Sequence, residues 1–279
     1  MLESFFYTSL LFKISFFAYL VATLVYLVGI FRKEKIIGTI SLALFGLAFL
    51  ACTVLIVHRW IEAGRPPFKS FYESLIFAIW TISLVSLIAE RKFRIKLIGL
   101  MSAVSIVGIF LFSLTKRDVE IIALPPALQT WMFIPHVISY FLAYGALFVA
   151  GLGAVLHLLF PRGMASHHTL GEQSRIDFSI FTYQITKFGF LLLTAGLLLG
   201  AWWGQNAWSN YWGWDPKENW AYITWLIFAA YLHFRNLAGW DPRKLSWVVI
   251  FGVLAIIFTY LGMDYLPTAE DSMHVYSTN

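Results

Sequence analysis

The stretch FFYTSLLFKISFFAYLVATLVYLVGIF, from Phe5 to Phe31, identifies the chain as a membrane protein. A helix needs about 20 predominantly apolar residues to cross the hydrocarbon layer of a bilayer, and this stretch is longer than that. It is also too long for the apolar core of a signal peptide, and it lacks a small-residue cleavage site. We therefore predict a transmembrane helix that is retained.

The rest of the chain continues this pattern. Of its 279 residues 59% are hydrophobic and 13% are charged, and its mean hydropathy is +0.74. Seven more apolar segments follow, at about 36–57, 71–89, 97–114, 132–160, 187–203, 216–236 and 245–263. Membrane barrels would show short alternating segments instead of these continuous runs. The sequence predicts an all-α polytopic helical bundle of about eight transmembrane helices, forming a single membrane domain over residues 1–279.

The distribution of basic residues predicts the orientation. The connections at 31–35, 90–96, 161–187 and 235–244 hold thirteen Lys and Arg residues, whereas those at 58–70, 115–131 and 204–220 hold six. Because basic residues concentrate in cytoplasmic connections, the first set is predicted to be cytoplasmic and both termini to be external. The sequence pI near 9.2 follows from these anchoring charges, so we expect contact with membrane lipid and no nucleic-acid partner.

Cysteine is represented once, by Cys52. One thiol forms neither an intramolecular disulfide nor a dithiol redox pair. Thiol chemistry associated with this protein must therefore come from a partner.

The most unusual segment is WWGQNAWSNYWGWDPKENW, residues 202–220, which we predict to be an external loop. Its six tryptophans are Trp202, Trp203, Trp208, Trp212, Trp214 and Trp220. An interfacial aromatic belt is one interpretation, although belts place a few aromatics at each helix end. The other is an apolar platform for a large flat ligand, either a porphyrin or a quinone headgroup. At the end of the segment, Asp215, Pro216 and Glu218 are typical of a helix N-terminus.

Histidines near this loop favour the porphyrin. His136 lies at the predicted outer start of the fifth span, and His274 lies in the outer C-terminal tail. Two neutral imidazoles suit the axial positions of a haem iron. His233 lies 17 residues after Pro216, or about 26 Å along a helix, and an ionisable residue at that depth suggests a second site unless it reaches the cytoplasmic headgroups.

The sequence around these residues resembles a known family. WSNYWGWDPKENW followed by AYITWLIFAAYLHFR (208–235) resembles the WWD signature of haem-handling proteins of cytochrome c maturation, in particular the CcsA/ResC branch of system II. GRPPFKSFYESLIFAIW (64–80), LPPALQTWMFIPHV (124–137) and the tail with His274 are similar to further segments of that family.

The resemblance implies specific roles for these residues. His136 and His274 would be the external axial ligands of haem b held over the tryptophans and Asp215, and His233 would be a transmembrane histidine that receives haem from the cytoplasmic side. Two positions depart from the family pattern. Arg65 and Ser70–Phe71 stand where a histidine and an asparagine are common, and the final motif reads His274-Val275-Tyr276 instead of His-Ser-Tyr.

The implied activity is delivery of haem and its attachment to the Cys-x-x-Cys-His motif of apocytochrome c, as part of a cytochrome c haem lyase complex. The nucleophilic thiols belong to the apocytochrome, so no residue of this chain is assigned a catalytic role. A CcsB/ResB-type subunit would be the membrane partner and supply a histidine to pair with His233, and a thioredoxin-like protein could keep the thiols reduced. Haem propionates need cationic partners, and Arg65 is the first candidate.

Two other functions remain open. One is a b-type haem or quinone-binding respiratory subunit, although His136 and His157 are 21 residues apart, or about 32 Å along a helix. The other is a transporter without catalytic function. We expect a bacterial cytoplasmic membrane, with a thylakoid membrane as the alternative.

Overall fold

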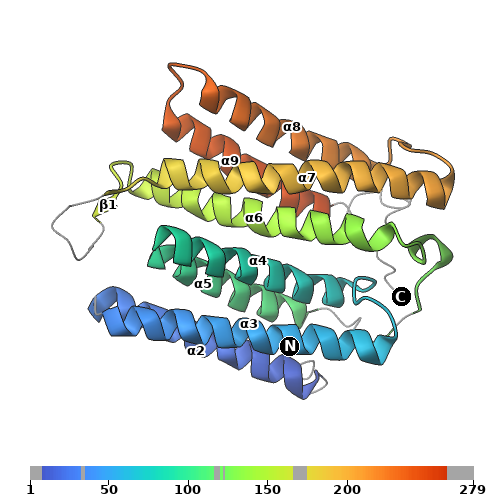
Figure 1. Ribbon diagram of the computed structural model, residues 1–279, viewed down its shortest axis with the longest axis horizontal. Coiled ribbons are helices and arrows are strands. Elements are labelled where there is room, and N and C mark those ends of the chain that lie inside the picture. The colour runs from blue at the N-terminus through green and yellow to red at the C-terminus, as the bar shows by residue number, and fades with distance from the viewer. Residues whose placement is uncertain (1–7, 33–34, 116–119, 122, 166–174, 263–279) are drawn as a thin grey trace. The chain divides into compact units, whose positions relative to one another are not determined.

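The computed structural model describes residues 8–32, 35–115, 120–121, 123–165 and 175–262. Over this part of the chain, eight long helices make up the fold (Figure 1). They are α2 (Leu10–Arg32), α3 (Lys35–Ala63), α4 (Phe71–Phe93), α5 (Lys96–Ser113), α6 (Phe133–Leu159), α7 (Phe178–Trp208), α8 (Pro216–Asn236) and α9 (Pro242–Ile257). The predicted all-α bundle is confirmed.

Shorter elements complete the fold. A 3-10 turn, η1 (Pro126–Leu128), precedes α6, and a π-helical turn, η2 (Phe258–Gly262), continues α9. The strands β1 (Met164–Ala165) and β2 (Arg175–Ile176) pair antiparallel between α6 and α7, with Met164 opposite Ile176.

The helices form two compact units, which divide at Pro126 and Ala127. In the first unit α2 packs on α3 and α5, and α4 packs on α3 and α5. In the second unit α6 packs on α7 and α9, and α8 packs on α7 and α9. Each unit is thus a closed arrangement of four consecutive helices. The sequence predicts a single membrane domain, and that stays a prediction, because the two units are each compact on their own.

Most of these helices have the length and composition of membrane spans. Within the described residues, seven helices qualify: α2, α3, α4, α5, α6, α7 and α9 with η2. The helix α8 is missing from this set, and its ends carry Lys217, Glu218, His233 and Arg235. The predicted span at 216–236 is therefore a helix with the predicted bounds, but a more polar one than its neighbours.

Side-chain caps explain where several helices begin. Ser70 accepts from the backbone N–H of Glu73 in a capping box at the start of α4. Asp177 accepts from two backbone N–H groups at the start of α7. Asp241 accepts from the backbone N–H of Arg243 at the start of α9, where Pro242 is in the first turn. These side chains satisfy donors that have no partner within the helix.

The helix α7 departs most from the sequence prediction. It was predicted over 187–203, and it extends from Phe178 to Trp208. At its end, Asn206 donates its side-chain amide to the carbonyl of Trp202, one turn earlier. Ser209 then ends the helix in the left-handed conformation, with φ of 58°. The predicted loop 202–220 is therefore largely helical, and the connection between α7 and α8 covers 209–215.

Candidate functional site

The histidine predicted to be an outer ligand, His136, lies in the first turn of α6 and is partly buried. Its Nδ1 atom lies 3.0 Å from the backbone carbonyl oxygen of Gly196 on α7. A carbonyl oxygen only accepts hydrogen bonds, so Nδ1 carries the proton in this arrangement. In a neutral imidazole, Nε2 then carries the lone pair that a metal ion can bind.

Trp203 supports the same imidazole. The two rings are stacked, with centroids 5.5 Å apart and planes inclined by 21°. Trp203 is 3% exposed, and its indole N–H donates to the carbonyl of Ala127 at 2.9 Å. This hydrogen bond fixes the indole of Trp203. The ring therefore packs against His136 and is not an open surface on which a ligand could lie.

Further tryptophans extend this aromatic packing. Trp208 packs edge-to-face on Trp203 at 4.7 Å. Trp202, which is 51% exposed, packs edge-to-face on Trp131 at 5.9 Å, and Trp131 is 71% exposed. Trp131 was not among the predicted site residues, although it lies five residues before His136. Large exposed indoles at the end of an apolar helix pair provide contact area for a flat apolar ligand.

The remaining predicted tryptophans have other neighbours. Trp212 contacts Trp214 at 6.1 Å and Tyr222 at 6.3 Å. Trp214 is 68% exposed and has φ of 58°. Trp220 packs on Phe258 at 4.3 Å, which ties α8 to η2. The six tryptophans therefore do not form a uniform loop surface: Trp203 and Trp220 are packing residues, and Trp202 and Trp214 present most of their area.

Asp215 shapes the end of this connection. It is 5% exposed and accepts from the N–H of Lys217 at 2.8 Å, while the carboxylate of Glu218 accepts from the N–H groups of Gly213 and Asp215. With Pro216 in the first turn, this is the predicted helix start, and the prediction is confirmed. The geometry assigns Asp215 a capping role.

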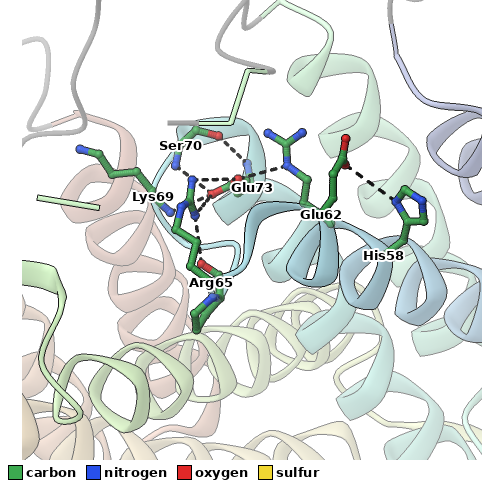
Figure 2. Close-up of polar contacts among 8 residues, drawn as sticks. His58, Glu62, Arg65, Lys69, Ser70 and Glu73 are labelled. Atoms are coloured by element: carbon green, nitrogen blue, oxygen red, sulfur yellow. Dashed lines mark hydrogen bonds and ion pairs between the residues drawn. The ribbon is translucent and has the colours of Figure 1, made fainter. Parts of the chain in front are cut away.

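Arg65 lies in the first unit, on the connection between α3 and α4 (Figure 2). It forms a two-pronged ion pair with Glu73. The Nε atom of Arg59 contacts the same carboxylate at 3.1 Å. The Arg65 and Glu73 side chains are 8% and 0% exposed. Arg65 thus already has a carboxylate partner, and its contact with a haem propionate stays a prediction.

Lys69 lies on the same connection. Burial, together with the charge of Arg65, lowers the pKa of its ammonium group, and Glu73 opposes this shift. Its backbone N–H also donates to Glu73 at 3.0 Å. The connection 64–70 is therefore held to α4 by one buried carboxylate that accepts from both side chains and backbone (Figure 2).

The predicted inner residue, His233, lies in the last turn of α8 and is exposed. Its ring packs edge-to-face against Phe234 at 5.5 Å. Two residues on, Arg235 donates to the hydroxyl of Ser179 at 3.1 Å and lies over the ring of Tyr183. His274, the second predicted outer ligand, falls outside the described residues.

No cluster of three or more His, Cys, Asp or Glu side chains suited to a metal ion occurs in the described part of the chain. A haem iron needs only axial ligands, because the porphyrin supplies the other four donors. His136, with a fixed tautomer and aromatic neighbours, meets that requirement for one axial position. The donor set at this end of α6 and α7 thus fits a haem.

Comparison with known proteins identifies the family. Residues 69–269 match the Cytochrome C assembly protein family. The chain is 33% identical to the cytochrome c biogenesis protein CcsA of Guillardia theta, over 91% of this chain and 92% of that protein. It is 32% identical to CcsA of Synechococcus elongatus, over 90% of this chain and 92% of that protein.

A solved structure is similar in fold. The cytochrome c heme lyase CcmF superposes with a TM-score of 0.65 at 21% identity, covering 90% of this chain. This chain spans 46% of that protein's length, and at this level of identity the likeness concerns the fold alone. The family match and the CcsA relatives cover most of the sequence. The chain therefore belongs to the cytochrome c assembly protein family, in its CcsA/ResC branch.

Proposed function

We propose that this chain is the haem-handling membrane subunit of a system II cytochrome c synthase. It presents haem b, as a substrate, at the end of the second unit where α6 begins and α7 ends. The observation that carries the proposal is the imidazole of His136, bonded through Nδ1 to the Gly196 carbonyl and stacked on Trp203. This leaves Nε2 with the lone pair that ferrous or ferric iron requires.

The surrounding indoles would hold the porphyrin plane. Trp131 and Trp202 expose most of their faces beside the buried Trp203. Contact with these faces removes apolar area from water and excludes water from the reacting edge of the substrate. His274 is the second axial ligand in this proposal, and it must be displaced for the histidine of the apocytochrome motif to take its place.

The thiols that react are those of the apocytochrome. Each cysteine S–H adds across a vinyl group of the haem, with sulfur on one carbon and hydrogen on the other, so the step itself needs no oxidant. Cys52 is fully buried, with its sulfur 3.9 Å from the carbonyl of Ile76, and takes no part. A thioredoxin-like partner would keep the substrate cysteines reduced.

His233 would hold haem earlier on its route. Its exposure on α8 supports the proposal that a second protein covers it, and the CcsB/ResB-type subunit would supply the opposing histidine. In this scheme the beginning of α6 and the end of α7 face the outside, as the basic residues predict, and the end of α8 faces the cytoplasm.

A respiratory b-type cytochrome fits less well. His136 and His157 lie at opposite ends of α6, and His157 is 5% exposed with its Nδ1 atom 2.8 Å from the hydroxyl of Ser246. Stacked haems between facing helices need histidine pairs at matching depths.

Reconstitution tests the proposal. The chain, a CcsB/ResB-type subunit and a test apocytochrome c are produced in cells that lack their own maturation system. We expect covalent haem staining of the cytochrome with wild-type protein and at least a tenfold loss with His136→Gly at equal membrane abundance. The same yield of holocytochrome from cells without this chain would contradict the proposed function.

A further inference from the structure

Two glycines of α7 face two aromatic rings of α6. A Cβ atom built on Gly200 would lie 2.6 Å from Cε1 and 2.8 Å from Nδ1 of His136. A Cβ atom built on Gly196 would lie 2.8 Å from Cδ2 of Tyr140. Gly196 and Gly200 are one helical turn apart, and so are His136 and Tyr140, so both pairs project from one face of their helix. At either position a methyl group would displace the ring.

This close approach permits the hydrogen bond of His136. Small residues spaced four apart let membrane helices approach until backbone atoms come within reach of side chains on the neighbour. Here the carbonyl of Gly196 accepts the Nδ1–H of His136 at 3.0 Å. That carbonyl also accepts the N–H of residue 200 within the α-helix, and its two lone pairs can accommodate both donors.

The arrangement determines which nitrogen is available to iron. Free histidine exchanges its proton between the two ring nitrogens, whereas a hydrogen bond from one of them selects a single tautomer. The ring is further restrained by its stacking on Trp203 and by its edge-to-face contact with Tyr140 at 5.0 Å. Outer-shell partners of this kind orient ligand histidines and raise metal affinity.

We propose that the Gly196 carbonyl and the side-chain-free surface of Gly200 are positioning elements that hold His136 with Nδ1 protonated and Nε2 as the iron-binding atom. The part of this inference that concerns iron rests on the proposed function. The part that concerns the tautomer is a property of the haem-free protein and can be measured separately.

The test compares Gly200→Ala with a matched control, Gly189→Ala. Both residues lie on α7 against α6, but the atoms nearest to a Cβ atom at 189 belong to Leu147 and Ala146, with Cγ of Leu147 at 2.8 Å. Each substitution therefore adds one methyl group to the same helix interface. A difference between the two variants reports on His136 and not on helix packing in general.

The first measurement is the tautomer. In full-length protein purified without haem and labelled with ¹⁵N-histidine, His136→Gln identifies the His136 signals. We expect Nδ1-protonated imidazole in wild type and in Gly189→Ala, and loss of this single state in Gly200→Ala. A wild-type His136 protonated on Nε2, or an unchanged tautomer in Gly200→Ala, would overturn the inference.

The second measurement is the affinity for added haem, followed by absorption. We expect Gly200→Ala to bind about 10- to 100-fold more weakly than Gly189→Ala, the range found when outer-shell partners of metal ligands are lost. If Gly200→Ala does not fold, His136→Gly/Gly200→Ala removes the clash. Free imidazole should restore haem binding to the double variant and to His136→Gly to the same extent, because an untethered ring can shift away from the methyl group.

The outcomes separate the two levels of the argument. Wild-type protein that binds no haem contradicts the proposed function, whatever the tautomer. Wild-type protein that binds haem, together with equal affinities of Gly200→Ala and Gly189→Ala, contradicts the positioning role alone.

Discussion

Arg65 and Glu73 form a buried, two-pronged ion pair, with Nη1 2.9 Å from Oε2 and Nη2 3.3 Å from Oε1. Arg59 approaches the same carboxylate at 3.1 Å, and the backbone N–H groups of Lys69 and Ser70 donate to it as well. One carboxylate thus pairs with two guanidinium groups and fixes the connection between α3 and α4.

Replacing Glu73 by Gln should therefore destabilise the protein. The substitution leaves two partly buried cations without a counter-charge, and breaking such a pair costs about 3–5 kcal/mol of unfolding free energy. Thermal unfolding in detergent measures the effect. The control is Glu62→Gln, whose partner His58 lies 3.9 Å away and whose side chain is 52% exposed; equal melting temperatures for the two variants would show that the cluster is not a stabilising element.

The pKa of Lys69 gives a pH-dependent prediction. Because its pKa in the folded state is lower than the ordinary lysine value of 10.5, its charged form is disfavoured by folding. This penalty is fully present below the folded-state pKa and disappears as pH rises toward and past 10.5. Lys69→Gln should thus unfold at a slightly higher temperature than wild type at pH 7, and the difference should shrink with rising pH. Lys69→Arg, which keeps its charge, should show no such gain; a gain for Gln that persists above pH 10.5 would contradict the argument.

Helix positions could be read from the sequence where local signals were strong. The bounds of α8 were predicted correctly because Asp215 and Pro216 specify a helix start. The helix α7 was predicted too short at both ends, since hydropathy detects membrane-compatible segments and not helices. Lys187 interrupts the apolar run at the predicted start, whereas the helix begins nine residues earlier at Phe178, with Asp177 as its N-cap. Gly204, Gln205 and Asn206 look like a loop, yet the helix continues through them to Trp208.

The sequence indicated candidate site residues, but not the groups that hold them in place. Sequence reasoning selected His136 and Trp203, and the structure brings them into contact. It missed Gly196 and Gly200, although glycines four apart in an apolar helix indicate close packing, because only the fold shows which side chain they face. It also missed the partner of Arg65, because only the fold shows that the carboxylate of Glu73 closes a capping box with Ser70 and also binds two arginines.

The thiol of Cys52 should be dispensable. It is buried in the first unit and lies outside any aqueous reaction site in this account. Cys52→Ala should retain nearly the full yield of holocytochrome c in the reconstituted system, with the amount of protein in the membrane checked by immunoblotting. Loss of maturation at normal abundance would mean that the chemistry has been misassigned.

The orientation can be tested in that cysteine-free background. Ser209 and Ala238 are both exposed and lie on connections at opposite ends of α8. A membrane-impermeant maleimide should label Ser209→Cys in intact cells, and Ala238→Cys only after permeabilisation. The reverse pattern would place the tryptophans on the cytoplasmic side and contradict the proposed direction of haem transfer.

Absorption and resonance Raman spectroscopy of the purified, haem-loaded protein test the central claim most directly. Wild type should show a Soret band and the signature of six-coordinate, low-spin iron with histidine ligation. His136→Gly should lose that signature, and added imidazole should restore it, since the vacated axial position accepts the free ring. A wild-type protein without a Soret band, or an identical spectrum for His136→Gly before imidazole is added, would contradict the assignment of His136 as a haem ligand.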